Sequence, residues 1–279
     1  MPEVLRGESE HGWWELVGGL PAPALRGAVR SYTGYREKSS APVRRREVPT
    51  GDVTLILSFG PTIDVADPAG GPPLRLTSFV APVDDTWAVT EYTGEQHGLE
   101  IALTPPGASR LLGVPMDELA GQALDLGDVI GAPGRRLAHQ LADLPDWPTR
   151  FALLDRVLPG LLDRGRAPSP AAAWAWRRLT ETDGRIAISS LTDELGCSHR
   201  YLVTEFRRHV GVPPKTLARV LRCTRAIRLL ERGGLRVGDV ALSCGYSDQA
   251  HLNRDFRLLT GITPTQWGSE YRLDLPKPA

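Results

Sequence analysis

Side chains that can read DNA bases recur in two segments of the chain, residues 198–211 and 248–261. Both are rich in arginine, and the second adds glutamine and asparagine. These side chain types form bidentate hydrogen bonds with base edges in the major groove. A helix that carries them outward, with its apolar residues turned to a core, fits that groove. The residue types therefore indicate a pair of DNA-reading helices.

The two segments also match each other as a repeat. At a shift of 50 residues and without a gap, five positions are identical: Leu202/Leu252, Phe206/Phe256, Arg207/Arg257, Gly211/Gly261 and Pro214/Pro264. Ser198 and Asp248, both good helix N-caps, coincide too. Upstream, a small residue precedes a glycine by four positions in each copy, as in the pairs Thr192–Gly196 and Ala241–Gly245. A small side chain lets two helices approach and glycine permits a sharp turn, so each copy is predicted to be a helix-turn-helix unit.

The outward positions of the repeat supply the candidate DNA-binding residues. These are Ser198, His199, Arg200, Thr204, Arg207 and Arg208 in the first unit, Lys215 on the helix that connects the units, and Gln249, His251, Asn253, Arg254 and Arg257 in the second unit. Four more arginines follow on the connecting helix at spacings of three or four, and some are expected to contact phosphates: Arg219, Arg222, Arg225 and Arg228. Each feature alone also suits an ordinary helical domain with a solvated face. The joint duplication of caps, core, basic face and glycine stop favours nucleic-acid binding.

The second part of the chain is predicted to be all helical. Caps and apolar spacing indicate about seven helices, at residues 171–182, 191–195, 198–210, 214–233, 237–244, 248–261 and from 263 onward. In the last of them, Thr263 and Gln266 form a capping box with proline at the first turn. Residues 164–170, rich in proline and glycine, are predicted to be the linker before this domain, which we place at 171–272, with a tail at 273–279.

The first part of the chain carries a different pattern, so the fold class expected is α+β. Apolar residues alternate over residues 53–59 and 99–103, which predicts a small antiparallel β-barrel or sandwich within a β-rich domain at 1–125. The three arginines at 44–46 are interpreted as a solvated strand edge. Residues 126–163 are predicted to be helical, with leucine stripes that must be buried, either on the sheet or in a dimer interface. Pro159 is expected to kink or end the last of these helices.

Charge separates the two parts of the chain. Residues 1–165 hold 15 basic and 22 acidic side chains, and residues 166–279 hold 18 and 11, so the net charges are −7 and +7. An acidic first part and a basic second part suggest that only the second meets a polyanion. The three cysteines lack a CxxC pair, and neither a secretory signal nor an apolar run of about 18 residues is evident, so a cytoplasmic protein without a membrane partner is expected.

Residues 171–272 resemble the DNA-binding domain of the AraC/XylS family of transcription regulators. The residues that carry the resemblance include Gly196, Ser198, Leu202, Phe206, Arg207, Gly211, Pro214, Arg222, Arg225, Ala241, Gly245, Asp248, Gln249, His251, Arg254, Phe256, Gly261 and Pro264. The resemblance implies two helix-turn-helix units joined by a long helix, with Arg200 and Thr204 facing bases in one unit and Gln249, His251 and Arg254 in the other. Family members often have arginine where this chain has Thr204, which weakens the contact expected there.

For the first domain the resemblance implies a cupin-like sensor or a dimerisation module. The partners it implies are double-stranded DNA, a small-molecule effector, RNA polymerase and a second copy of the chain. Three aromatic residues are candidates for an effector pocket, Trp14, Tyr35 and Trp87, although such residues are more often core. A purely structural first domain is the alternative. No cofactor or metal is expected, since the HxH…E spacing of cupins is absent. An enzyme is disfavoured, because the first domain has no cysteine for a zinc-dependent methyltransferase and the chain has no GxSxG, HExxH or P-loop motif.

Overall fold

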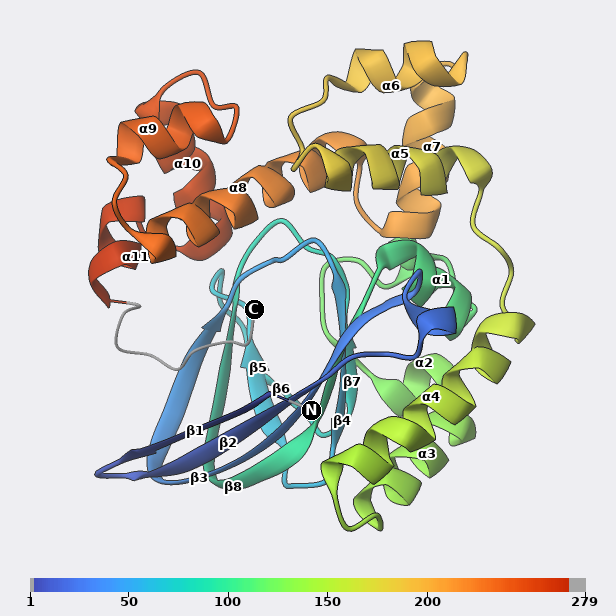
Figure 1. Cartoon of the computed structure of the whole chain (residues 1–279), viewed down its shortest axis with the longest axis vertical. Coiled ribbons are helices and arrows are strands. Elements are labelled where there is room, and N and C mark those ends of the chain that lie inside the picture. Colours follow the sequence, from blue (N-terminus) through green and yellow to red (C-terminus); the bar gives the residue numbers. More distant parts are fainter. Residues whose placement is uncertain (1–2, 271–279) are drawn as a thin grey trace.

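Alternating apolar residues in the first part of the chain build a nine-stranded antiparallel sheet in the computed structural model, which describes residues 3–270 (Figure 1). The strands are β1 (Val4–Ser9), β2 (Gly12–Gly19), β3 (Val29–Glu47), β4 (Val53–Ser58), β5 (Ile63–Ala66), β6 (Leu74–Leu76), β7 (Phe79–Ala81), β8 (Ala88–Leu103) and β9 (Leu124–Asp125). Their order is β1-β2-β3-β8-β4-β7-β9, and the β5–β6 hairpin attaches to β8. The predicted α+β class, with a small antiparallel barrel or sandwich, is confirmed.

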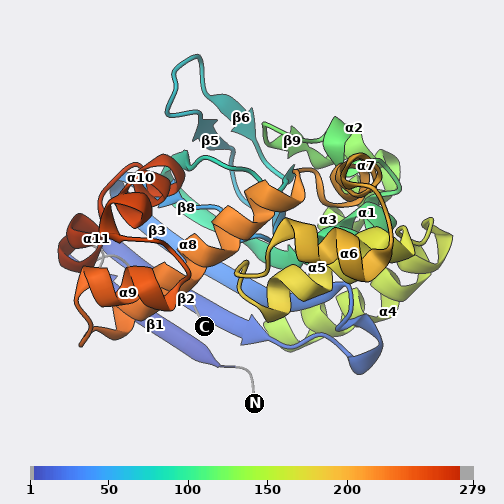
Figure 2. The same ribbon diagram turned by 90° about the horizontal axis from the view of Figure 1, so that it is seen from above.

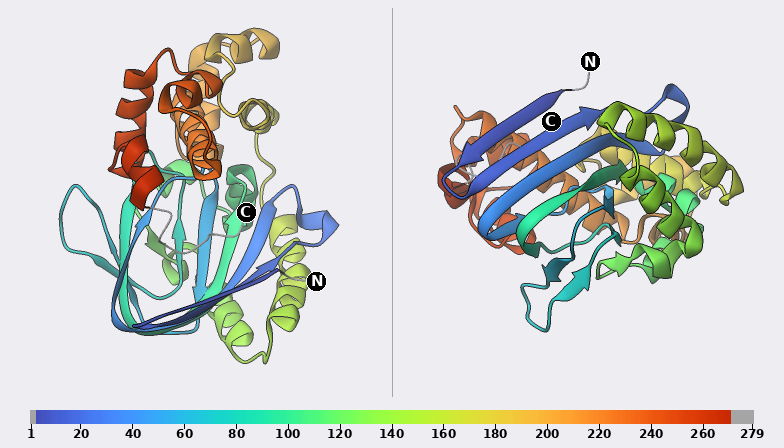
Figure 3. Two further views of the ribbon diagram at one scale, coloured as in Figure 1. Left: turned by 60° about the vertical axis from the view of Figure 1, so that its left-hand side comes forward. Right: turned by 90° about the horizontal axis from the view of Figure 1, so that it is seen from below.

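Helices cover one face of this sheet. They are α1 (Pro105–Leu112), α2 (Leu126–Ile130), α3 (Ala132–Ala142) and α4 (Trp147–Arg164), seen at the flank of the sheet in Figures 1 and 3. Two glycines let α4 approach: a Cβ at Gly34 would lie 2.4 Å from the Trp147 ring, and one at Gly19 2.7 Å from Phe151. The covered face carries the fully buried Leu99 and Ile101 of β8.

The leucine stripes of α3 and α4 pack into this internal core. Leu141, Leu154 and Leu158 have no exposed surface and belong to the same apolar cluster as the strands. These stripes therefore offer no apolar face to a second copy. Of the two outcomes expected at Pro159, an end of the helix was wrong, because α4 continues to Arg164, and a kink stays a prediction. Proline removes one backbone hydrogen bond, and burial of the flanking leucines stabilises the helix across that gap.

The helical domain lies over one end of the sheet (Figures 1 and 3). Within the described residues it has seven helices: α5 (Pro170–Glu181), α6 (Ile188–Leu195), α7 (His199–Val210), α8 (Pro214–Arg232), α9 (Val237–Ser243), α10 (Gln249–Thr260) and α11 (Pro264–Glu270). Residues 165–169 connect it to α4. The expected end at residue 272 and the tail at 273–279 lie outside the described residues. No helix in the described part of the chain is long and apolar enough to cross a membrane.

Helix α8 crosses the top of the molecule and carries one helix-turn-helix unit at each end (Figure 2). Unit 1 is α6 with α7, and unit 2 is α9 with α10. The apolar core of unit 1 is continuous with that of the sheet, through buried residues such as Leu202 and Phe206. Unit 2 has a separate core, in which Leu252 and Phe256 pack on Cys223 and Ala226 of α8. One repeat is thus supported in two different ways.

Candidate nucleic-acid interface

Side-chain caps define the start of the two outward helices. The Ser198 hydroxyl accepts a hydrogen bond from the backbone N–H of Tyr201 at 3.2 Å, at the start of α7. The Asp248 carboxylate accepts one from His251 N–H at 2.7 Å, at the start of α10. That backbone hydrogen bond is the largest contribution that lowers the pKa of Asp248. Both caps lie where the repeat predicts them, so each satisfies one of the orphan N–H groups at the start of its helix.

Glycine makes the turn between the two helices of each unit. Gly196 has a φ of +62° and Gly245 a φ of +80°, both in the left-handed region. A residue with a Cβ is strained there. Each turn thereby changes the direction of the chain between the short helix and α7 or α10. The longer helix then has one face buried in the domain and the other exposed.

The outward face of α7 is polar and open. Leu202 and Phe206 are fully buried, whereas the predicted DNA-binding side chains of this unit are exposed: Ser198, His199, Arg200, Thr204, Arg207 and Arg208. Lys215 is exposed at the start of α8. The Ser198 hydroxyl is occupied as the helix cap, which leaves the arginines and Thr204 as the groups most available to DNA.

The outward face of α10 combines amide and guanidinium groups. Ala250, Asn253, Arg254, Arg257 and Leu258 line one open concavity on this face. Gln249 is exposed beside it, at the first position of the helix. Arginine and asparagine are the side chains suited to guanine and adenine edges respectively. Of the two units, this one brings more base-reading chemistry together.

His251, also a predicted base reader, is half-buried and engaged within unit 2. Its ring lies 5.1 Å from the Tyr246 ring in an edge-on arrangement, and its Nδ1 is 3.2 Å from the Ser247 hydroxyl. Its Nε2 lies 3.8 Å from the Asp255 carboxylate. The structure thus gives His251 internal partners that the repeat pattern did not show.

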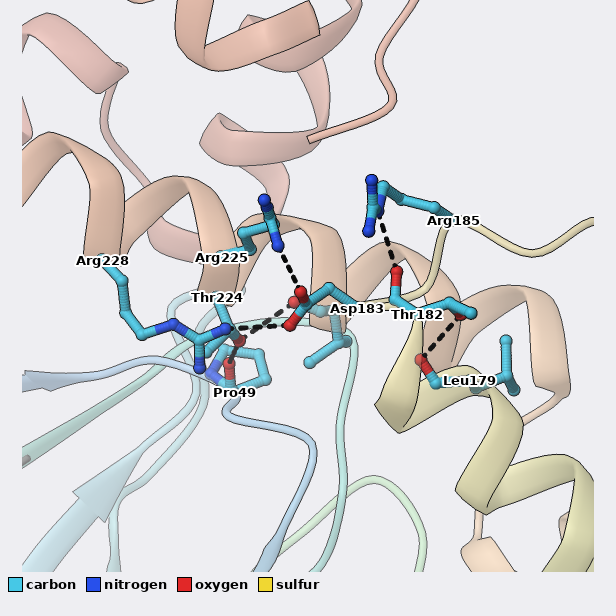
Figure 4. Close-up of polar contacts among 9 residues, drawn as sticks. Pro49, Leu179, Thr182, Asp183, Arg185, Thr224, Arg225 and Arg228 are labelled. Carbon is cyan, nitrogen blue, oxygen red and sulfur yellow. Dashed lines mark hydrogen bonds and ion pairs between the residues drawn. The ribbon is translucent and has the colours of Figure 1, made fainter. Parts of the chain in front are cut away.

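The four arginines of α8 have intramolecular partners that the sequence did not show, and their expected contacts with phosphates stay a prediction. Arg219 pairs with Asp85 of the first domain at 2.7 Å. Arg225 and Arg228 both pair with Asp183, at 2.5 and 3.0 Å (Figure 4). Arg222 donates to the carbonyl oxygen of Gly184 at 3.2 Å. Spacing along α8 showed that these side chains share a surface but not which groups lie opposite, because those groups come from distant segments.

Of arginines 44–46, which the sequence analysis interprets as a solvated strand edge, only Arg44 is exposed. All three lie inside β3, paired with β8 on one side, and two of them have buried partners. Arg45 makes two hydrogen bonds with the Glu37 carboxylate. Arg46 donates to the carbonyl oxygen of Thr260 at the end of α10, and its guanidinium lies 4.4 Å from the centre of the Trp87 ring. Arg46 thereby joins the first domain to unit 2, a role for which the sequence carries no local signal.

The three effector candidates do not form one group. In the strand register Trp14 lies opposite Glu37, which is two residues from Tyr35, so both aromatic side chains are on the face of the sheet away from α1–α4. Tyr35 packs there beside a small apolar cluster, and burial raises the pKa of its hydroxyl. Trp87 lies apart, against Gly261 of unit 2, where a Cβ would be 2.5 Å from its ring.

Across residues 3–270, no group of three or more His, Cys, Asp or Glu side chains could hold a metal ion.

Comparisons with known proteins agree with the geometry of the helical domain. Residues 191–270 match the family model described as "Helix-turn-helix domain". The HTH-type transcriptional activator RhaR of Escherichia coli K12 is 33% identical over 81 residues, which are 29% of this chain and 29% of RhaR. The chain thus spans less than a third of the length of the curated relatives it matches.

The arrangement of both domains has a counterpart among solved structures. ToxT from Vibrio cholerae superposes with a TM-score of 0.50 at 10% identity, covering 87% of this chain and 98% of that one. At this identity the likeness concerns the fold alone. The family match and the identity to RhaR confirm the resemblance to the AraC/XylS family for the helical domain alone, which is a helix-turn-helix domain behind a β-rich first domain.

Proposed function

We propose that the whole chain is a sequence-specific transcription regulator whose two units read successive major-groove segments of one DNA site. The observation that carries this proposal is the pair of capped helices α7 and α10, each with a buried Leu-Phe face and an exposed face of arginine and polar side chains. Phosphate contacts from exposed basic groups position such a domain, and base-edge contacts specify its site. Double-stranded DNA is therefore the partner, and the cytoplasm the expected location.

The first domain is proposed to modulate DNA binding. Two of its segments contact α8 and unit 2. In residues 46–49, Arg46 bonds unit 2 and the Pro49 carbonyl accepts from the Thr224 hydroxyl at 3.5 Å. In residues 85–87, Asp85 pairs with Arg219 and Trp87 lies against unit 2. A shift of the strands that end at these contacts would therefore displace α8 and α10 directly. A small-molecule effector, a second copy or RNA polymerase could act through this route.

An effector site is proposed on the sheet face that holds Trp14 and Tyr35. Gln96 lies on the same face, opposite Glu37 in the register, and is only 1% exposed. Its amide nitrogen donates to the Pro61 carbonyl, while its Oε1 has no hydrogen-bond partner among the described residues. A buried acceptor without a partner is costly, so a ligand or water with a donor group would be held there. A purely structural first domain is the competing proposal, and thermal-shift screening against metabolites separates the two.

No enzymatic activity is proposed, because the curated relatives of the helical domain are regulators. The leucine stripes that suggested a dimer are buried internally and no longer support it. Dimerisation stays a prediction, which sedimentation of the full chain would check.

The decisive experiment is selection of bound duplexes from a random DNA pool with the full chain. We expect one enriched bipartite motif, and an affinity that falls steeply as salt rises, since each phosphate contact contributes a slope of about 0.9 in log affinity against log salt. Arg257→Ala should weaken binding, whereas the exposed α4 control Arg156→Ala should not. Absence of any enriched motif, or an affinity independent of salt, would overturn the proposed function.

A further inference from the structure

The two units share no apolar core, so something other than core packing must fix one relative to the other. The N-terminal half of α8 lies in the core of unit 1 through Leu217 and Ala218, and its C-terminal half lies in the core of unit 2 through Cys223 and Ile227. Further contacts join the parts of the helical domain around α8, and several of them converge on one short loop.

That loop is residues 182–185, between α5 and α6 (Figure 4). Asp183 has a φ of +47° and is the one non-glycine residue with positive φ in the described part of the chain. Its two carboxylate oxygens accept separately, Oδ2 from Arg225 at 2.5 Å and Oδ1 from Arg228 at 3.0 Å. The Asp183 side chain is 25% exposed, so this double ion pair is partly shielded from water. A strained backbone position is thus held by two cations of α8.

The neighbours of Asp183 reach into unit 2 itself. Arg222 donates to the Gly184 carbonyl at 3.2 Å, and the same guanidinium lies 3.8 Å from Asp255 of α10 and 5.3 Å from the Tyr246 ring. The aliphatic part of Arg185 lies over the turn of unit 2, where a Cβ at Gly245 would be 3.1 Å from its Cγ. One loop therefore touches the connecting helix and the turn of unit 2, and through Arg222 it is linked to α10.

We infer that residues 182–185 form a latch that fixes the distance and angle between α7 and α10, with Asp183 as its positioning residue. The inference rests on the proposed function. Asp183 acts through Arg225 and Arg228, not by touching DNA. When unit 1 has bound, the latch holds unit 2 over the adjacent major groove, which raises its effective concentration there. It also makes binding sensitive to the spacing between the two half-sites.

The first test compares Asp183→Asn with the wild-type full chain. Asparagine has the same shape and tolerates the left-handed conformation, so mainly the charge is lost. Binding is measured to the selected site, to each half-site alone, and to sites with one or two base pairs added or removed between the halves. We expect the variant to lose about tenfold in affinity for the intact site, which is part of the gain of about 10²–10⁴ that linkage of two modules provides. Half-site affinities should stay unchanged, and the preference for one spacing should flatten.

Matched variants separate positioning from general damage. Arg225→Lys keeps a cation opposite Asp183 and should retain the spacing preference, whereas Arg225→Met should behave like Asp183→Asn. Asp163→Asn removes an 80% exposed carboxylate of α4 and should change nothing. An Asp183→Asn variant with wild-type spacing preference, or with half-site losses as large as its intact-site loss, overturns the inference.

A second measurement needs no DNA and therefore distinguishes failure of the latch from failure of the proposed function. Spin labels are placed at Arg200→Cys and Arg254→Cys in a Cys197→Ser background, since Cys223 and Cys244 are buried. The distance distribution between labels should be narrow in the wild type and in Asp163→Asn, and broad in Asp183→Asn. The broadening should increase with Arg46→Ala, which removes the first domain's bond to Thr260. An equally narrow distribution in Asp183→Asn contradicts the latch whether or not the protein binds DNA.

Discussion

Units 1 and 2 are copies of one motif, but they are held in the molecule by different means. Phe206 of unit 1 belongs to a core that continues into the sheet, whereas Phe256 of unit 2 belongs to a separate core. Unit 2 meets the first domain at Arg46, Val48 and Trp87. We therefore expect unit 1 to unfold together with the first domain. We expect the position of unit 2 to be the one that responds to a change in the first domain.

The reading faces differ as well. At a shift of 50 residues Thr204 of unit 1 corresponds to Arg254 of unit 2, and Val203 to Asn253. Thr204 and Arg254 are both exposed. Arginine can bond two guanine acceptors at once, whereas threonine reaches one group or a thymine methyl. We therefore expect unit 1, which shares its core with the first domain, to be the poorer reader of bases, with Arg200 as its own candidate for guanine.

The largest difference between the units is expected from truncation of their core phenylalanines. Phe206→Ala and Phe256→Ala each remove a fully buried ring, at a cost of about 3–5 kcal/mol. Hydrogen exchange should show that Phe206→Ala lowers protection in the sheet and in α5–α7 together. Phe256→Ala should lower it in α9–α11 alone. Equal loss of sheet protection in both variants would show that the two cores are coupled and would contradict the difference in support between the units.

Specificity should follow the second unit. Arg254→Ala is expected to cost about 1–3 kcal/mol against the preferred sequence and to flatten one half of the site, because a bidentate contact is lost. Thr204→Ala should cost well under about 1 kcal/mol, and Arg207→Ala should weaken all sequences alike. Competition binding with single-base variants of the site measures each effect. Equal information in both halves, or a Thr204→Ala loss that matches Arg254→Ala, would contradict the asymmetry.

A smaller effect is expected at the contact between the first domain and unit 2. Arg46→Ala removes the guanidinium that bonds the Thr260 carbonyl and stacks on Trp87, and it should reduce protection of α10 and α11 by about 1 kcal/mol. Arg44, two residues earlier on the same strand, is exposed and provides the control as Arg44→Ala. Identical exchange in the two variants would mean that Arg46 does not anchor unit 2.

The smallest effect concerns pH at the joint between unit 1 and the first domain. His209 accepts from the Ser169 N–H at 3.1 Å through Nε2, and its Nδ1 lies 3.3 Å from the Ser109 hydroxyl. Burial lowers its pKa below the ordinary value of 6.5, so the folded protein holds the neutral ring. Below pH 6.5 the unfolded chain therefore binds more protons at this residue than the folded one, and stability falls until the folded pKa is passed. Urea unfolding at pH 7.5 and 5.5 should show a smaller decrease for His209→Gln than for the wild type. An equal decrease in the free energy of unfolding of both proteins would show that His209 is not the source of the pH dependence.

Local patterns were enough to predict most of the helical domain. The caps at Ser198 and Asp248 and the box at Thr263 and Gln266 depend on residues three positions apart, and the structure has all of them. The exposure of Arg254 and burial of Phe256 follow from the helical period in the same way. Strand alternation likewise sufficed for the class of the first domain, though not for the course of β3 through its three arginines.

By itself, then, the sequence determined the repeat, its two helix starts, its buried and exposed faces and the α+β class, because each depends on neighbours within one or two helical turns or on alternation along a strand. Only the tertiary structure decided which group faces each charge. Arg225 finds Asp183 42 residues away, and Arg46 finds Thr260 214 residues away. It also decided that the leucines of α4 turn to their own sheet. The sequence does not distinguish an arginine that contacts water from one that binds a phosphate or a carboxylate. Which of these partners it has depends on the packing of distant segments.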